Sequence, residues 1–151
     1  MRIGLISDTH GLVRPEALQA LAGVERIIHA GDVGGADVVE ALTRIAPVAV
    51  VRGNNDKDAW GRQLAPWLAL EFDGVGVHVL HDLNEMDLDP AAAGFRVVVA
   101  GHSHKPRVIE RDGVLFVNPG SAGPRRFSLP VTLAYLDIEA GVARAEIRPL
   151  L

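Results

Sequence analysis

Residues 2–10, RIGLISDTH, and residues 26–32, RIIHAGD, decide the fold class, because each is a short apolar run that ends in polar side chains. Runs of this kind are typical of buried parallel strands. An initial proline and the spacing of Ala and Leu predict a helix over 15–21. A second helix over 36–45 and a third strand over 48–51 follow. Two consecutive strand–helix–strand units predict a parallel sheet with right-handed crossovers.

The second half of the chain is rich in hairpin signals. Asp-Gly or Ala-Gly pairs separate neighbouring apolar or alternating runs, a pattern that predicts tight turns between antiparallel strands. The turns fall at 73–74, 112–113 and 140–141. We also expect a strand over 96–100 and a short helix over 86–93. No repeat or linker interrupts the sequence, so residues 1–151 are expected to form one α/β domain with mixed sheets.

Composition excludes several classes of protein. The chain has no cysteine, which excludes disulfide frameworks, thiolate zinc sites and cysteine nucleophiles. Fifteen basic against nineteen acidic residues give a net charge of −4, which disfavours a nucleic-acid partner. No apolar run approaches the roughly 18 residues of a membrane span, and the first run is too short for a signal peptide. We therefore expect a cytoplasmic protein without a membrane partner.

Polar side chains follow five of the predicted strands at the points where these strands end. They are Asp8, His10, Asp32, Asn54, His81, His102 and His104. Taken singly, each also fits a turn, a helix cap or a structural histidine. Strand ends converge on one crevice in α/β sheets, and imidazole, carboxylate and carboxamide groups together suit first-row transition metals. Seven donors exceed the needs of one tetrahedral ion, whereas two ions that share a carboxylate use them all.

Five motifs at these strand ends together resemble the calcineurin-like metallophosphoesterase superfamily. They are Asp8-x-His10, Gly31-Asp32-x-x-Gly35, Gly53-Asn54-x-Asp56, His81 and Gly101-His102-x-His104. The chain length and residues 118–121, NPGS, resemble its small single-domain branch, which includes the YfcE-like phosphodiesterases and the retromer-subunit fold. The resemblance implies a four-layer α/β/β/α sandwich with a dinuclear site at the strand ends.

The resemblance also implies a ligand set and a reaction. One ion would be held by Asp8, His10 and His104, and the other by Asn54, His81 and His102. Asp32 would bridge them and position a metal-bridging hydroxide, which attacks a small phosphate ester in line. The expected reaction is diester hydrolysis, with monoester hydrolysis as an extension. Manganese is the expected metal, and nickel, iron and zinc are alternatives.

One position departs from the fullest superfamily pattern. Many members carry a histidine between the Asn and the Asp of the third motif, where it can protonate the leaving alkoxide; here that residue is Asn55. Asn55 has no titratable proton. This predicts either that the enzyme prefers esters with good leaving groups or that water on the metal protonates the leaving group. Asp56 is expected to hold Asn54 or to cap a helix. Asn54 and Asn118 are candidates for substrate contact, and the Asn118 turn is alternatively expected to orient His102.

Other polar or aromatic residues are predicted to be structural. We expect His29 and His78 to be packed histidines and Trp67 to belong to the core. The alternative function is a protein-binding scaffold like the retromer subunit, with weak or no catalysis, and a homo-oligomer is compatible with either function. The intact set of seven donors favours the enzyme.

Overall fold

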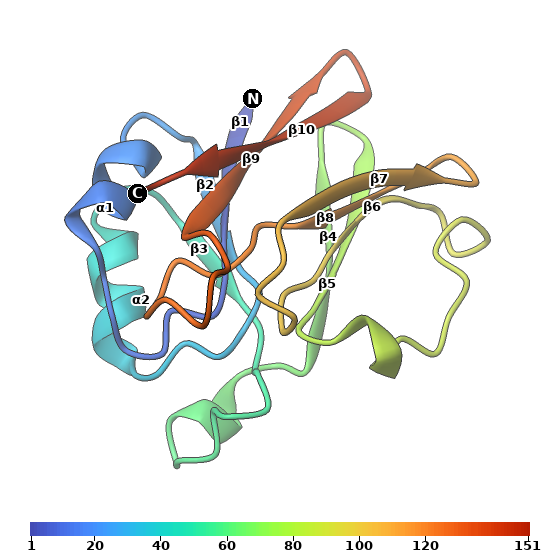
Figure 1. Cartoon of the computed structure of the whole chain (residues 1–151). Coiled ribbons are helices and arrows are strands. Elements are labelled where there is room, and N and C mark those ends of the chain that lie inside the picture. The colour runs from blue at the N-terminus through green and yellow to red at the C-terminus, as the bar shows by residue number, and fades with distance from the viewer.

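The computed structural model describes residues 1–151, which form two five-stranded sheets packed face to face (Figure 1). The first sheet has the strand order β10-β9-β1-β2-β3, and the second has the order β4-β5-β6-β8-β7. The strands are β1 (Arg2–Ile6), β2 (Arg26–His29), β3 (Val48–Val50), β4 (Trp67–Phe72), β5 (Val75–Leu80), β6 (Phe95–Val99), β7 (Arg107–Arg111), β8 (Val114–Asn118), β9 (Thr132–Glu139) and β10 (Val142–Pro149).

The main core lies between the two sheets. Alternate residues of β1, β2 and β9 meet alternate residues of β5, β6 and β8, and this cluster contains 14 buried side chains such as Leu5, Val99 and Leu136. Burial of so many branched aliphatic side chains drives the two sheets together. The sandwich and its mixed sheets are as predicted from the sequence.

Two short helices cover the outer face of the first sheet (Figure 1). Helix α1 (Pro15–Leu21) begins with proline at its first turn, and α2 (Ala36–Thr43) buries Val38 and Leu42. Their apolar stripes pack with Ile6, Ile27 and Leu133 in a second cluster. The longer of the two α-helices has eight residues, and no helix is long and apolar enough to cross a membrane.

The outer face of the second sheet carries only a thin layer, a 3₁₀ turn η2 (Leu83–Glu85) and the loop after it. The helix predicted over 86–93 is absent, and this prediction was wrong. Pro90 disfavours a helical conformation in the residue before it. The carboxylate of Asp89 accepts hydrogen bonds from the amides of Ala91 and Ala92, which fixes a turn instead. A second 3₁₀ turn, η1 (Gly61–Gln63), lies between β3 and β4.

Strand pairing explains how both sheets contribute to one edge. β1, β2 and β3 run parallel in the first sheet. In the second sheet β5, β6 and β8 also run parallel. The expected hairpins are present, but their other members β4 and β7 pair at the two outer sides of this trio and do not separate its strands. The loops after β1, β2, β3, β5 and β6 therefore meet along the seam between the sheets.

Candidate metal centre

The seven donors predicted from the strand ends are all in this seam. Asp8 and His10 follow β1, Asp32 follows β2 and Asn54 follows β3, so the first sheet supplies four of them. His81 follows β5, and the pair after β6 completes the set. The two motifs farthest apart in the sequence are joined directly, since the amide of His102 donates to Asp8 Oδ2 at 3.1 Å.

Five of these side chains sit on strained backbone. Asp8, His10, Asp32, His102 and His104 have φ values of 56°, 46°, 55°, 71° and 62°. A non-glycine residue in the left-handed region costs on the order of 1–3 kcal/mol and persists only where the surroundings impose it. Three of the other four such residues lie at hairpin turns, where this conformation is expected. The strain at the five donors is concentrated in one place, as it is in functional sites.

The first group of donors is Asp8, His10 and His104. Asp8 Oδ1 lies 3.2 Å from His104 Nε2 and 4.0 Å from His10 Nε2. Three ligand atoms, one from each residue, all lie within 4.8 Å of one another. Asp8 is fully buried, yet its Oδ1 has no hydrogen-bond partner, and neither has His10 Nε2. A buried carboxylate oxygen without a partner is costly, so these atoms are arranged for a cation.

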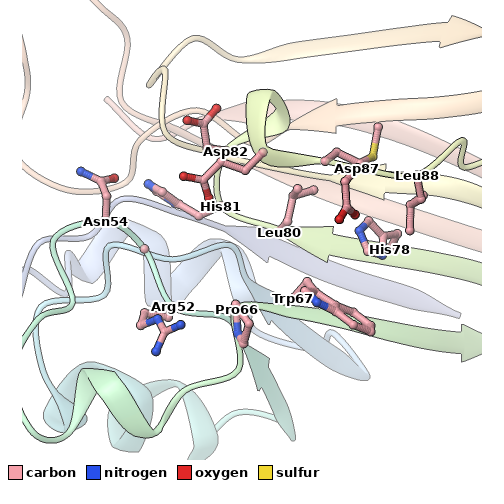
Figure 2. Close-up of a pocket in the computed structure, with 13 residues that line it drawn as sticks. Arg52, Asn54, Pro66, Trp67, His78, Leu80, His81, Asp82, Asp87 and Leu88 are labelled. Carbon is pink, nitrogen blue, oxygen red and sulfur yellow. The ribbon is translucent and has the colours of Figure 1, made fainter.

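The second group is centred on His81. Its Nδ1 donates to the carbonyl of Ala30 at 2.7 Å, which leaves the lone pair of Nε2 directed into the seam. His81 Nε2 lies 3.3 Å from Asp32 Oδ2 and 3.3 Å from His102 Nδ1. His102 Nδ1 in turn lies 3.1 Å from Asn54 Oδ1. Figure 2 shows the His81 ring directed toward Asn54, and the two residues lie in the loops that follow β5 and β3.

Asp32 lies between the two groups. Its Oδ2 is 3.7 Å from His10 Nε2 in the first group and 3.3 Å from His81 Nε2 in the second. Asp8 Oδ1 is also 3.8 Å from His81 Nε2, so two carboxylates contact both groups. That Asp32 bridges two ions stays a prediction, and its position is the one this role requires.

The electrostatics of the cluster hold Asp32 and His104, but not His81, in the forms that ligate cations. Burial alone would raise the pKa of Asp32, but hydrogen bonds with His81 and from Asn55 outweigh it and hold that pKa well below its usual range. Burial lowers the pKa of His104, and the charge of Asp8 offsets only part of this effect. For His81 the balance is reversed, because Asp32 and Asp8 overcome burial and raise its pKa.

Asp8 is oriented by a residue that the sequence did not single out. Ser7 Oγ donates to Asp8 Oδ2 at 2.6 Å, and with the His102 amide it fully occupies that oxygen. Oδ1 is consequently the oxygen left free to bind. The only sequence signal is a small polar residue at the end of an apolar strand, a signal that is common at strand ends without any function.

Asn55 fixes Asp32. The backbone amide of Asn55 donates to Asp32 Oδ1 at 2.8 Å, and its side-chain Nδ2 donates to Oδ2 at 3.0 Å. Both oxygens are therefore held in one orientation. Asn55 therefore positions Asp32, and the absence of a proton donor at its position stays a prediction.

Asp56 caps no helix, and it holds the backbone of the loop that carries Asn54 rather than the Asn54 side chain. Its carboxylate accepts hydrogen bonds from the backbone amides of Val33, Gly34 and Gly53 at 2.8–3.2 Å. It contacts no Asn54 side-chain atom through these bonds and caps no helix. Asp56 instead ties the loop after β2 to the loop after β3, which fixes the separation between the two loops that carry Asp32 and Asn54.

Asn118 acts on the loop that carries the histidine pair. Its Nδ2 donates to the carbonyl of Gly101 at 3.0 Å and to Ser103 Oγ at 3.1 Å. This contact agrees with the interpretation that the Asn118 turn orients His102. His29 is a packed histidine, as expected, with Nε2 bonded to Thr9 Oγ1 at 3.0 Å and Nδ1 accepting from the Gly31 amide.

Comparison with known proteins gives a consistent family. Residues 1–141 match the model of the calcineurin-like phosphoesterase superfamily domain. A probable metallophosphoesterase from Methanothermobacter thermautotrophicus is 33% identical, and the match covers 97% of this chain and 91% of that protein. A phosphodiesterase from Methanocaldococcus jannaschii is 29% identical over 92% of this chain and 94% of that protein.

Solved structures share the fold. A structure described as a novel archaeal phosphodiesterase superimposes with a TM-score of 0.80, at 25% identity and over 97% of this chain and 99% of that one. YfcE, a phosphoesterase from E. coli, gives a TM-score of 0.71 at 26% identity, over 91% and 88% of the two chains. Vps29 from Entamoeba histolytica, solved with Zn²⁺, gives 0.76 at 20% identity over both full chains. At that identity the last match shows the fold alone.

Proposed function

Because the chain belongs to the calcineurin-like phosphoesterase superfamily, we propose that it is a metal-dependent phosphodiesterase with a dinuclear site. One observation carries the proposal: buried ligand atoms without hydrogen-bond partners, Asp8 Oδ1 and His10 Nε2 among them, face one another across the seam between the sheets. Phosphoester hydrolysis is the activity that the names of its relatives support.

We propose that the two groups of donors hold one divalent ion each. Asp8, His10 and His104 form the first set and Asn54, His81 and His102 the second, with Asp32 shared between them. The donor set fits manganese, because it combines neutral imidazoles with hard oxygens and no thiolate. Nickel, iron and zinc suit the same donors.

When bound, such ions polarise phosphoryl oxygens and lower the pKa of water toward neutrality. The chain's own part is to hold the donors at fixed separations and to keep Asp8 Oδ1 dry, so that no reorganisation is needed when substrate arrives. No side chain at the end of β3 donates a proton to the leaving alkoxide, because Asn55 is committed to Asp32. We therefore propose a preference for esters with good leaving groups.

The test is to assay metal-free protein with Mn²⁺, Ni²⁺, Mg²⁺ or Zn²⁺ on bis(4-nitrophenyl) phosphate and 4-nitrophenyl phosphate. We expect metal-dependent hydrolysis that falls at least about 100-fold in Asp32→Ala and His104→Ala, a loss in the range for ligand or orienting residues. Asp73→Asn is the control, since it lies at the hairpin turn between β4 and β5 and keeps a residue that tolerates positive φ. Hydrolysis without any metal, or rates in the two alanine variants that equal the wild-type rate, would refute the proposal.

Leaving-group preference is measured separately. We expect the enzyme to accelerate cleavage of the aryl bond of methyl 4-nitrophenyl phosphate far more than cleavage of a dialkyl phosphate such as dimethyl phosphate. Each acceleration is measured relative to the rate without enzyme. An equal enzymatic acceleration of both bonds would show that a proton donor exists and would contradict the role given to Asn55.

A second candidate function is a protein-binding scaffold, which the fold match to Vps29 favours. A scaffold of this kind does not need ions in the seam for its activity. If the metal-loaded protein hydrolyses no phosphate ester while it still binds ions at Asp8 and His104, the scaffold becomes the better proposal.

A further inference from the structure

A cavity of about 420 Å³ opens beside the second group of donors (Figure 2). Asn54 and His81 lie at its near end, so it begins where we propose that the phosphate binds. Trp67 and His78 lie at its far end. Its volume is in the range of cavities that hold small molecules.

His78 is the residue at the far end that the fold does not explain. Four buried side-chain nitrogen or oxygen atoms in the protein lack a hydrogen-bond partner; three belong to the candidate ligands and the fourth is His78 Nδ1. His78 is 3% exposed, and its ring lies between Trp67 and Phe95, with centroid separations of 5.8 Å and 5.0 Å. Burial lowers its pKa although Asp87 opposes the shift, so the ring is neutral near pH 7.

Trp67 supplies a flat surface at the same place. It was expected in the core, but it begins β4, an edge strand of the second sheet, and is 56% exposed. The correction has a physical reason: the alternating pattern of β4 cannot reveal that no element covers this side of the strand. An exposed indole face stacks well on a planar ring, and such stacking contributes about 1–3 kcal/mol per base.

The charges that line the cavity select against anions. Asp82, Glu85 and Asp87 border it against one arginine, Arg52, and Figure 2 shows the Asp87 carboxylate beside the His78 ring, with Arg52 away from this end. Asp82 has another partner, since its Oδ2 lies 3.7 Å from His102 Nε2. Asp87 has no such partner. A group that enters the far end therefore meets hydrogen-bond acceptors and negative charge, which favour N–H donors and disfavour a second phosphate.

The length of the cavity decides between candidate groups. His78 and His81 are three residues apart on β5 and just beyond it, a separation of about 10 Å along the strand. A two-carbon amino alcohol esterified to a phosphate at the donors does not span this distance. A nucleoside does, because its sugar separates the phosphorus from the far edge of the base.

We infer that this cavity binds the nucleoside arm of a phosphodiester, with the base stacked on Trp67 and its exocyclic amino group donating to Asp87 and to the free nitrogen of His78. The inference rests on the proposed phosphodiesterase function and adds its substrate class, a nucleotide ester whose base carries an amino group. It concerns single nucleotides, since the acidic lining rejects the next phosphate of a polymer.

A matched pair of substrates tests it. Cytidine and uridine 5′-(4-nitrophenyl) phosphates differ at C4, which carries an amino group in cytidine and a carbonyl in uridine, and at N3, which is an acceptor in cytidine and an N–H donor in uridine. Ethyl 4-nitrophenyl phosphate lacks the nucleoside. With the metal-loaded protein we expect kcat/KM for cytidine to exceed that for uridine about tenfold, the value of a hydrogen bond to a charged acceptor. We expect Asp87→Asn to remove this ratio, and Trp67→Ala to lower both nucleotide esters about tenfold or more.

The ethyl ester separates the two proposals. Its hydrolysis should be unchanged in Asp87→Asn and Trp67→Ala, and in the control Glu110→Gln on β7. If the ethyl ester is not cleaved with any metal, the proposed function fails. If it is cleaved but the cytidine and uridine esters react equally, or a choline ester outpaces both, the nucleoside inference is overturned.

A binding measurement on the metal-free protein is independent of catalysis. Cytidine 5′-monophosphate stacked on Trp67 should quench tryptophan fluorescence at lower concentration than uridine 5′-monophosphate does. The chain has two tryptophans, so Trp67→Phe assigns the signal. Quenching that is the same for both nucleotides, or that survives in Trp67→Phe, would overturn the inference.

Discussion

Replacing Asp56 by alanine should destabilise the protein and weaken its ion binding together, because one carboxylate ties two loops of the candidate metal centre. Asp56 accepts the amides of Val33 at 3.0 Å, Gly34 at 3.2 Å and Gly53 at 2.8 Å. Asp56 is itself only 5% exposed, so water replaces its carboxylate poorly once it is removed.

The size of the effect follows from these three bonds. Gly34 is exposed, so water can satisfy its amide, whereas the amides of Val33 and Gly53 stay buried. Each bond to a charged acceptor is worth about 1.5–3 kcal/mol, so the two buried bonds give a loss of about 3–6 kcal/mol for Asp56→Ala. Asp56→Asn keeps one acceptor oxygen and the shape, and should lose about 1–2 kcal/mol.

Urea unfolding of the metal-free protein measures this loss. We expect the midpoint of Asp56→Ala to fall by about 2 M, with an unchanged slope. Asp58→Ala is the control, because Asp58 accepts one amide, that of Gly61, at 2.8 Å and is exposed; it should lose less than about 1 kcal/mol. Calorimetric titration should show ion affinity about 10–100-fold lower in Asp56→Ala only. A loss below about 1 kcal/mol, or equal losses in both variants, would refute this account.

Three further substitutions or titrations test other parts of the site. In Gly101→Ala the new methyl would lie 2.6 Å from Asp8 Oδ2, so we expect a loss of about 1–3 kcal/mol in unfolding free energy and weaker ion binding by calorimetry. Burial lowers the pKa of His29 to about 3. The unfolded chain protonates His29 first on acidification, so the contribution of His29 to stability is constant above about pH 6.5 and falls by about 3 kcal/mol by pH 4. Nitrogen-15 NMR of His29 should show a neutral ring at pH 5, and a charged ring there would contradict this assignment. Asn55→Ala removes one bond to Asp32, and we expect ion affinity about tenfold lower with unfolding free energy changed by less than about 1 kcal/mol; unchanged affinity would mean that the backbone amide suffices.

The candidate ligands could be predicted from the sequence because each stands where an apolar run ends. Strand ends are local features, and Asp8, Asp32 and His102 are placed by the strand that precedes each of them. The parallel pairing of β1, β2 and β3 also follows from short crossovers, which local patterns reveal.

Supporting contacts could not be predicted, because they depend on how separate loops approach one another. Asp56 bonds the amides of a loop 22 and 23 residues earlier, and Asn118 reaches back to Gly101. Nothing in the side-chain pattern marks which backbone amides will lie nearby. The exposure of Trp67 escaped prediction for a related reason, since edge and central strands share the same alternation.

The location of the donors in the seam between the two sheets has a mechanical consequence. Asp8 and Asp32 follow strands of one sheet and His81 and His104 follow strands of the other, so any ion that binds both sets links the two sheets. Its binding energy then adds to the cohesion of the sandwich, by about 2.7 kcal/mol at a hundredfold excess over Kd. Conversely, a cavity deep in the core, such as Val99→Ala would create, should lower the ion affinity although Val99 is not a ligand. The ion affinity of this protein therefore reports how tightly its two sheets pack against each other.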